Sequence, residues 1–189
     1  MIGIDPGTTQ SAIVRIDDDG KLISHKMMPN RQLEKELRHA ADAVAIEMIA
    51  CQGMAVGQET FFTCVWIGQF ISAAHAHVGV CLVYRRDVKL HLCGNQRAKD
   101  ANVRQALIDR YGSGSEKKGK RCPKCKGEGF RPRDRQHWYE QGVATCPKCH
   151  GAKWLKPPGK LAGIKDHEWA ALAVAVTAQG NPGCLIKTD

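Results

Sequence analysis

The segment between residues 113 and 159 is the feature that most restricts how this chain of 189 residues can fold. It is rich in Lys, Arg, Cys and Gly and poor in the apolar residues that make a domain core. A module of that size and composition needs an added staple, such as a bound metal ion, before it can fold. We therefore expect a main domain made of residues 1–112 and 160–189, with residues 113–159 inserted as a separate module.

Two CxxC pairs, separated by twenty residues, supply such a staple: they are Cys122, Cys125, Cys146 and Cys149. Four thiolates at this spacing are typical of a zinc ribbon, in which Zn²⁺ is bound tetrahedrally. Since four protein ligands leave no open coordination position, the Zn²⁺ is expected to be structural. Its binding is expected to fold the inserted module.

The inserted module also carries the excess positive charge of the chain. Residues 113–165 contain 14 of the 28 Lys and Arg residues but only 4 of the 19 Asp and Glu residues. Such a concentration indicates contact with a nucleic-acid backbone, although a solvated basic surface would have the same composition. The basic residues proposed to bind DNA here are Lys124, Lys126, Arg131, Arg133, Arg135 and Lys148.

Several features favour a cytoplasmic protein. The sequence contains no stretch of about 18 apolar residues, so no membrane span is expected. The N-terminus does not resemble a secretory signal peptide. The odd total of nine cysteines argues against a disulfide framework. The five cysteines outside the CxxC pairs are expected to be small buried hydrophobic residues: Cys51, Cys64, Cys81, Cys93 and Cys184.

The order of apolar patterns in the main domain predicts a mixed α/β fold. Three strands are expected to precede a helix capped by Asn30, and strands and helices then alternate until a last helix rich in Ala and Leu. The expected strands cover residues 2–4, 11–16, 21–25, 43–47, 78–84 and 88–92, and the expected helices cover 30–42, 62–77, 99–111 and 165–178.

Acidic residues stand at the ends of these elements. Asp5 and Glu47 each end a predicted strand, and Asp166 and Glu168 open the last helix. Strand ends of an open sheet meet at one edge, so these carboxylates can converge there. Oxygen ligands of this kind suit a divalent ion that hydrolyses phosphodiesters. Any one of them alone is better explained as a strand-end residue that faces water.

Several segments together resemble the RuvC Holliday-junction resolvases, which are nucleases of the RNase H-like superfamily. The segments GIDPGTTQSAI (3–13), AIEMIA (45–50), IGQFISAA (67–74), the stretch 83–111 and DHEWAALAVAV (166–176) appear in the order of that family. The resemblance implies an RNase H-like mixed sheet flanked by helices, a homodimer, and Mg²⁺- or Mn²⁺-dependent cleavage of four-way or branched DNA.

The resemblance also assigns roles to residues. It makes Asp5 and Glu47 catalytic metal ligands and places His167 at the first metal position of the last helix. Lys89 and Lys99 fall in a region that contacts DNA. A small resolvase with an inserted ribbon would suit a bacteriophage or mobile element that must remove branches from its DNA.

The chain departs from the family pattern at Ala170, where the family has a metal-binding Asp. Three interpretations remain open. Asp166 can replace the missing carboxylate, since residues i and i+4 share a helix face. Ala170 can instead be an inactivating substitution, or the protein can be a naturally weak or inactive nuclease. His167 can bind the metal ion or move a proton.

Two other functional classes are consistent with parts of the sequence. GIDPGTT also resembles the phosphate-binding turn of actin-like ATPases. That fold, however, needs two such domains and a second phosphate loop, and 189 residues are too few for them. The second class is a non-catalytic protein that binds branched DNA, which Ala170 and the basic module favour.

Overall fold

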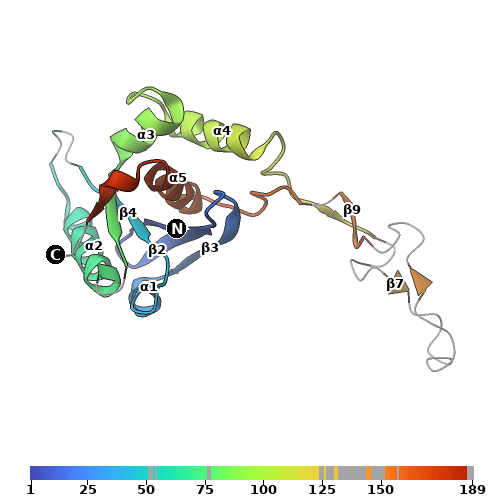
Figure 1. Cartoon of the computed structure of the whole chain (residues 1–189), viewed down its shortest axis with the longest axis horizontal. Coiled ribbons are helices and arrows are strands. Elements are labelled where there is room, and N and C mark those ends of the chain that lie inside the picture. Colours follow the sequence, from blue (N-terminus) through green and yellow to red (C-terminus); the bar gives the residue numbers. More distant parts are fainter. Residues whose placement is uncertain are drawn as a thin grey trace. The chain divides into compact units, whose positions relative to one another are not determined.

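A computed structural model gives the fold of the chain (Figure 1). It describes all residues except 51, 52, 54, 76, 77, 124, 125, 127–129, 132–143, 146–151, 157 and 187–189. The chain divides into two compact units. Unit 1 comprises Met1–Arg110 and Ile164–Asp189, and unit 2 comprises Tyr111–Gly163.

A six-stranded sheet with the order β10-β5-β4-β1-β2-β3 forms the centre of unit 1. The first three strands form an antiparallel meander, whereas β4 pairs in parallel with both β1 and β5. The sheet is therefore mixed, as the sequence predicted. The strands are β1 (Ile2–Asp5), β2 (Gln10–Ile16), β3 (Leu22–Pro29), β4 (Val44–Met48), β5 (Val80–Tyr84) and β10 (Leu185–Ile186).

Helices cover the sheet, and the predicted mixed α/β fold is confirmed. The helix α5 contacts β1, β2 and β4, while α1 and α2 contact each other and different strands. Figure 1 shows α5 crossing the strands of unit 1. The helices are α1 (Asn30–Leu37), α2 (Gln58–His75), α3 (Arg85–Cys93), α4 (Asp100–Tyr111) and α5 (His167–Gln179).

Alternation along β1 assigns its side chains to two faces. Ile2 and Ile4 are buried in the core cluster that contains residues of α1 and α2. Gly3 lies under α5, where a Cβ atom would stand 2.2 Å from the carbonyl oxygen of Ala171. Only glycine permits this close approach of helix and strand. Asp5 has the same parity as Gly3, so its side chain belongs to the face covered by α5.

The predicted strand over residues 88–92 is wrong, because this segment is part of α3. The alternation of Val88, Leu90 and Leu92 mimics a strand, yet Leu90 is exposed while Val88 is buried and Leu92 half-buried. Spacing of four residues between the covered positions is helical. The helix ends at Gly94, which adopts a left-handed conformation with φ of 65°.

Asn30 does not cap the first helix. Pro29 occupies the cap position and makes no side-chain cap bond, and the helix ends at Leu37 rather than at residue 42. The Asn30 side chain is buried, accepts a hydrogen bond from Ser11 Oγ at 2.7 Å and donates one to the Gly7 carbonyl at 2.8 Å. It thereby ties β2 to the turn that follows Asp5.

The cysteines of unit 1 are not all free thiols, contrary to the prediction. Cys81 on β5 and Cys184 form a disulfide, with their Cα atoms 5.2 Å apart and the two residues 103 positions apart in sequence. Strand β10 begins directly after Cys184 and pairs with β5, which brings the two thiols together. Cys64 and Cys93 are free and half-buried, and Cys51 lies outside the described residues.

Unit 2 contains two short antiparallel pairs, β6 (Lys120–Arg121) with β9 (Trp154–Lys156) and β7 (Phe130–Arg131) with β8 (Ala144–Thr145). Cys122 is buried directly after β6, and its amide donates to the Lys153 carbonyl at 3.0 Å. The other three predicted zinc ligands, Cys125, Cys146 and Cys149, lie outside the described residues.

In the described part of the chain, no helix is both long and apolar enough to span a bilayer.

Candidate active site

The two predicted catalytic carboxylates lie side by side at one end of the sheet. Strands β1 and β4 run in parallel with Ile4 opposite Ile46, so Asp5 and Glu47 follow at the next register position. Both have the parity of the face that α5 covers. They are also well covered, since their side chains are 15% and 16% exposed. Strand alternation and the parallel register therefore explain why two residues 42 positions apart in sequence lie next to each other at the sheet edge.

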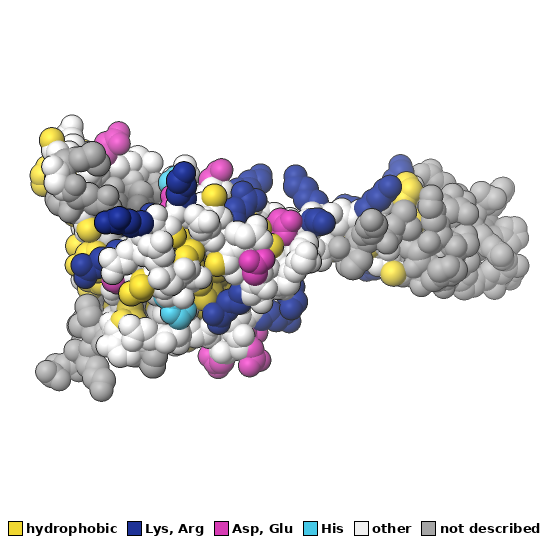
Figure 2. Space-filling model, turned by 90° about the horizontal axis from the view of Figure 1, so that it is seen from above, with side chains coloured by type: hydrophobic (Ala, Val, Ile, Leu, Met, Phe, Trp, Pro, Cys, Tyr) yellow, Lys and Arg dark blue, Asp and Glu magenta, His cyan; other side chains and the backbone are white. Residues whose placement is uncertain are grey.

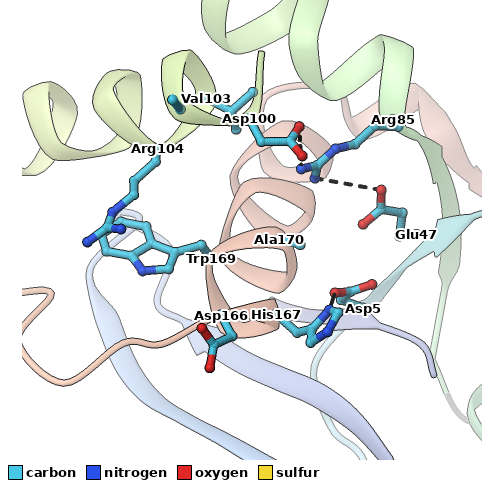
Figure 3. A pocket seen from close by; sticks show the side chains of 11 residues that line it. Asp5, Glu47, Arg85, Asp100, Val103, Arg104, Asp166, His167, Trp169 and Ala170 are labelled. Atoms are coloured by element: carbon cyan, nitrogen blue, oxygen red, sulfur yellow. Dashed lines mark hydrogen bonds and ion pairs between the residues drawn. The ribbon is translucent and has the colours of Figure 1, made fainter.

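These carboxylates line a pocket of about 610 Å³ between the sheet edge, α4 and the start of α5 (Figure 3). All five residues proposed as catalytic from the sequence contribute to its wall. The lining residues are Asp5, Glu47, Arg85, Asp100, Ala101, Val103, Arg104, Asp166, His167, Trp169 and Ala170. A polar pocket with converging carboxylates is the expected setting for phosphodiester chemistry.

His167, the first residue of α5, is bound to Asp5. Its Nδ1 lies 2.8 Å from Asp5 Oδ2, and most of the imidazole is exposed to the pocket. Burial raises the pKa of the Asp5 carboxyl above its ordinary value, and the His167 hydrogen bond and the Arg85 charge oppose that rise. The pair can thus pass a proton between a carboxylate and an imidazole that faces solvent.

Glu47 is the more strongly perturbed carboxyl. Its pKa is raised from 4.5 to about 7, first by burial and then by the negative charge of Asp5, while the Arg85 charge opposes the rise. When both neighbouring carboxylates are ionised, the surrounding groups balance their negative charge poorly, as the raised pKa values indicate. The raised pKa values indicate a site that would gain from a bound cation.

Arg85 and Asp100 complete one side of the pocket and were not foreseen from the sequence. Arg85 Nη1 lies 3.6 Å from Glu47 Oε1, and Arg85 Nη2 lies 2.9 Å from Asp100 Oδ1. One signal existed for Arg85, since it directly follows the parallel strand β5 and so had to stand at the same sheet edge. Asp100 reaches the pocket only through the placement of α4, which local sequence does not encode.

Trp169 and Arg104 form another wall that the sequence did not indicate. The Arg104 guanidinium lies over the Trp169 ring, 4.6 Å from its centre. Such cation–π contacts hold an arginine in place while leaving its nitrogens free to bind other groups.

The last helix offers no carboxylate in place of the alanine at position 170. Asp166 stands one residue before α5 with a φ of 36°, so the helical i, i+4 relation does not place it over Ala170. In Figure 3, His167 lies between Asp166 and Asp5. Glu168 is buried and bound to His25 and to the Lys165 amide, and it does not line the pocket.

The basic residues proposed to bind DNA are only partly described. Lys89 on α3 is partly covered and lies 3.8 Å from Asp100, while Lys99 and Lys126 are exposed. The structure describes the backbone of Arg131 but not its side chain, and Lys124, Arg133, Arg135 and Lys148 lie outside the described residues. On the visible face of unit 1, Lys and Arg side chains occur in several separate places rather than in one patch (Figure 2).

The pocket contains side chains whose atoms a divalent ion accepts as ligands. Asp5 and Glu47 offer oxygen atoms and His167 a nitrogen, which are ligands that Mg²⁺ and Mn²⁺ accept. Among the described residues, no three His, Cys, Asp or Glu side chains are already gathered tightly enough to hold an ion. Ala170 contributes no donor where a second ion would need one.

Comparison with known proteins identifies the fold but not a family. No family model matches the sequence, and no curated protein matches it. A structure of RuvC from Thermus thermophilus matches with a TM-score of 0.59 and 18% identity over 98% of both chains. RuvC from T. thermophilus in complex with a Holliday junction substrate matches with a TM-score of 0.54, again at 18% identity over 98% of both chains. At this identity the likeness concerns the fold, and the chain has the RNase H-like fold of RuvC.

Proposed function

We propose that this protein is a structure-specific endonuclease that resolves four-way or branched DNA by metal-dependent hydrolysis. The observation that carries the proposal is the meeting of Asp5, Glu47 and His167 at one pocket. This pocket lies on a fold shared with RuvC, one structure of which holds a Holliday junction. The activity, substrate and site roles are inferences from that combination.

The reaction follows from the proposed donor set. Water adds to the phosphorus, one P–O ester bond breaks, and the products are a phosphate monoester and a sugar hydroxyl. Asp5, Glu47 and His167 would hold Mg²⁺ or Mn²⁺, which when bound supplies Lewis-acid activation of water and neutralises phosphate charge. His167 has one nitrogen left besides the one tied to Asp5, and that nitrogen either joins the metal ligands or, where Asp5 and Glu47 hold the ion alone, carries the proton lost by the water.

The inserted module is proposed to bind structural Zn²⁺ and DNA. Cys122 is buried at the end of β6, as a ligand of an enclosed metal site would be. Its three proposed partners are Cys125, Cys146 and Cys149. The high positive charge of residues 113–165 would neutralise phosphates beside a branch point.

A homodimer is proposed because paired nicks in a nearly two-fold substrate require two equivalent active sites. Exposed apolar side chains on α2 offer a surface for a second copy of the chain: Phe61, Phe62 and Val65. Residues spaced by three and four positions share one helix face, so these side chains form a continuous patch. A nuclease of this kind would act in the cytoplasm.

A non-catalytic DNA-binding role is the second candidate, and Ala170 is the observation that favours it. Both candidates predict tight binding of branched DNA, whereas only the nuclease predicts strand cleavage. The pair Asp5 and His167 favours the nuclease, because a protein that only binds DNA has no need for a carboxylate–imidazole pair in a polar pocket.

The test uses a synthetic four-way junction labelled on each strand in turn, with a linear duplex of the same sequence as the comparison. With Mg²⁺ or Mn²⁺, the wild-type chain should nick two opposite strands at symmetric positions and leave the duplex intact. Asp5→Asn should bind the junction with unchanged affinity and nick it at least about 100-fold more slowly. Tight junction binding by both proteins without any nicks would assign the protein to the binding class.

A further inference from the structure

Arg85 lines the pocket beside Glu47, and the proposed reaction gives its charge no role. It is the first residue of α3 and directly follows β5, and its side chain is 26% exposed. It lines the main pocket and also a second hollow of about 410 Å³, and both hollows include Asp5 and Glu47. Arg85 therefore borders both of the hollows that contain the two carboxylates.

The two terminal nitrogens of Arg85 have different surroundings. Nη2 is held 2.9 Å from Asp100 Oδ1, and Lys89 approaches the same oxygen at 3.8 Å. Nη1 is buried and has no hydrogen-bond partner among the described residues, since Glu47 Oε1 lies 3.6 Å away. Figure 3 shows the guanidinium between Asp100 and Glu47. One nitrogen is thus fixed, and the other is a buried donor that lacks an acceptor.

A buried donor without an acceptor is unfavourable unless a ligand supplies one. A phosphate oxygen is the acceptor that fits best, because guanidinium groups bind phosphate with strong, charge-assisted and directional bonds. The carboxylates on either side of Arg85 would repel a phosphate, so a cation close to Glu47 is needed to bring one in.

The charge balance of the site points to the same residue. Two-ion nucleases place a second cation against the oxygens of the reacting phosphate. Here position 170 is alanine, and no carboxylate within the described helix α5 lines the pocket; Asp166, which does line it, stands just before the helix. The positive charge found on that side of Glu47 is the Arg85 guanidinium, which Asp100 holds in position.

We propose that Arg85 contacts the scissile phosphate through Nη1 and supplies the positive charge of a second metal ion, so that the site works with one ion. This proposal rests on the proposed nuclease function. Asp100 is then a positioning residue, because it acts on the phosphate only by orienting Arg85.

The test compares Arg85→Ala with Arg38→Ala. Arg38 directly follows α1, is 60% exposed, pairs with Glu34, and lines neither of the two hollows. Two quantities are measured: the single-turnover rate of junction cleavage at saturating Mn²⁺, and the number and affinity of bound Mn²⁺ ions from the electron paramagnetic resonance signal of the free ion.

Arg85→Ala should cut about 100-fold more slowly, because it removes a donor aimed at the transition state. Its Mn²⁺ affinity should be equal to or higher than that of the wild type, because a positive charge beside Glu47 is gone. Arg85→Lys should keep part of the rate, since it preserves the charge and loses the planar fork. Arg38→Ala should stay within about threefold of the wild type in rate, because Arg38 lines neither hollow.

Ala170→Asp supplies the complementary test. The wild type should bind one Mn²⁺ per chain, Ala170→Asp should bind two, and the Arg85→Ala/Ala170→Asp double variant should recover part of the lost rate. An Arg85→Ala protein that cuts at the wild-type rate would overturn the proposal, and so would one that no longer binds Mn²⁺.

The outcomes also separate this proposal from the proposed function. A wild-type chain that binds one Mn²⁺ and cuts no DNA would remove the nuclease function. The proposal for Arg85 would fall with it, because no scissile phosphate would be left to contact. A wild-type chain that cuts the junction, with equal ion counts in the wild type and in Ala170→Asp, would overturn the proposal for Arg85 and leave the nuclease function in place.

Discussion

Glu47 carries the strongest electrostatic perturbation of any single residue in the described site, and its origin is structural. Because side chains alternate along β4, the Glu47 side chain lies on the face that α5 covers. The parallel pairing of β4 with β1 places it next to Asp5. Burial and the Asp5 charge raise its pKa to about 7, so the site favours protonation until a cation arrives. The residue that suits a metal ion is thus a source of instability in the metal-free protein.

This perturbation predicts an unusual pH dependence of stability without metal. The pKa of Glu47 is higher in the folded chain than its ordinary 4.5, so the folded state binds the proton more tightly. Its contribution therefore favours folding at low pH and is lost as the pH rises from about 4.5 to about 7. The lost free energy of unfolding is about 3 kcal/mol for a rise of that size.

Glu47→Gln should remove this contribution. In urea titrations with a chelator present, the variant should be more stable than the wild type at pH 8 and similar to it near pH 4.5. Added Mn²⁺ should raise the stability of the wild type at pH 8 and have little effect on the variant. A wild-type stability that does not fall between these pH values relative to Glu47→Gln would contradict the electrostatic description.

At the level of secondary structure, the packing of α5 on β1 holds the site together. Gly3 permits the contact, and two residues later the same strand delivers Asp5 beneath the start of α5. The carboxylate and the imidazole meet because helix and strand backbones approach closely.

Gly3→Ala should therefore destabilise the protein. Its Cβ would meet the Ala171 carbonyl oxygen at 2.2 Å, and overpacking of this kind costs about 1–3 kcal/mol. Gly68→Ala on α2 is the matched control, since no atom lies within 4 Å of its Cβ. There the substitution should stabilise the helix by about 0.5–1 kcal/mol. Urea unfolding followed by circular dichroism measures both, and equal effects of the two substitutions would refute the close-packing explanation.

The same elements explain which features could be predicted from the sequence. Short apolar runs indicated β1, β2, β4 and β5, and the mostly apolar or Ala- and Leu-rich composition of α2 and α5 and the mixed pattern of α4 indicated these helices. Alternation along the strands places Asp5 and Glu47 on one face. Helix α3 was mistaken for a strand because three apolar residues alternate in a segment whose burial follows a helical spacing. Arg85 was overlooked although it directly follows β5, because only carboxylates at strand ends were considered.

Other features depend on contacts distant in sequence. The Cys81–Cys184 disulfide requires the short strand β10 to pair with β5, which no local pattern indicates. Asp100 enters the pocket because α4 is placed beside it, and its sequence context is that of an ordinary first residue of a helix. Tertiary packing decides such positions, so periodicity and spacing alone cannot reveal them.

For the whole molecule, the zinc site is expected to control the fold of unit 2 alone. The purified chain should contain one Zn²⁺, and a chelator should abolish protection from hydrogen exchange in residues 111–163 while leaving the strands of unit 1 protected. Cys149→Ser should reproduce the effect of the chelator. Cys64→Ser, which alters a free thiol on α2, should not change the zinc content. A metal-free chain with the same protection in both units would exclude a structural zinc.

The dimer is expected to form through the exposed patch on α2. Phe62→Glu should shift the molecular mass measured by light scattering from two chains to one, because it places a charge in an apolar contact. Ile23→Glu on β3 changes a residue that is also exposed and apolar but lies outside the patch, and it should leave the mass unchanged. A dimer that persists in Phe62→Glu would assign the interface to another surface.

The central claim is that this chain cuts branched DNA with the residues that it has, despite the alanine at position 170. The most direct measurement is cleavage of a four-way junction in Mn²⁺ by the wild type and by Ala170→Asp, side by side. We predict paired, symmetric nicks by the wild-type chain itself. Cleavage by Ala170→Asp alone, with the wild type only binding the junction, would contradict the claim that Arg85 makes up for the missing carboxylate. The absence of cleavage by both proteins would contradict the nuclease function.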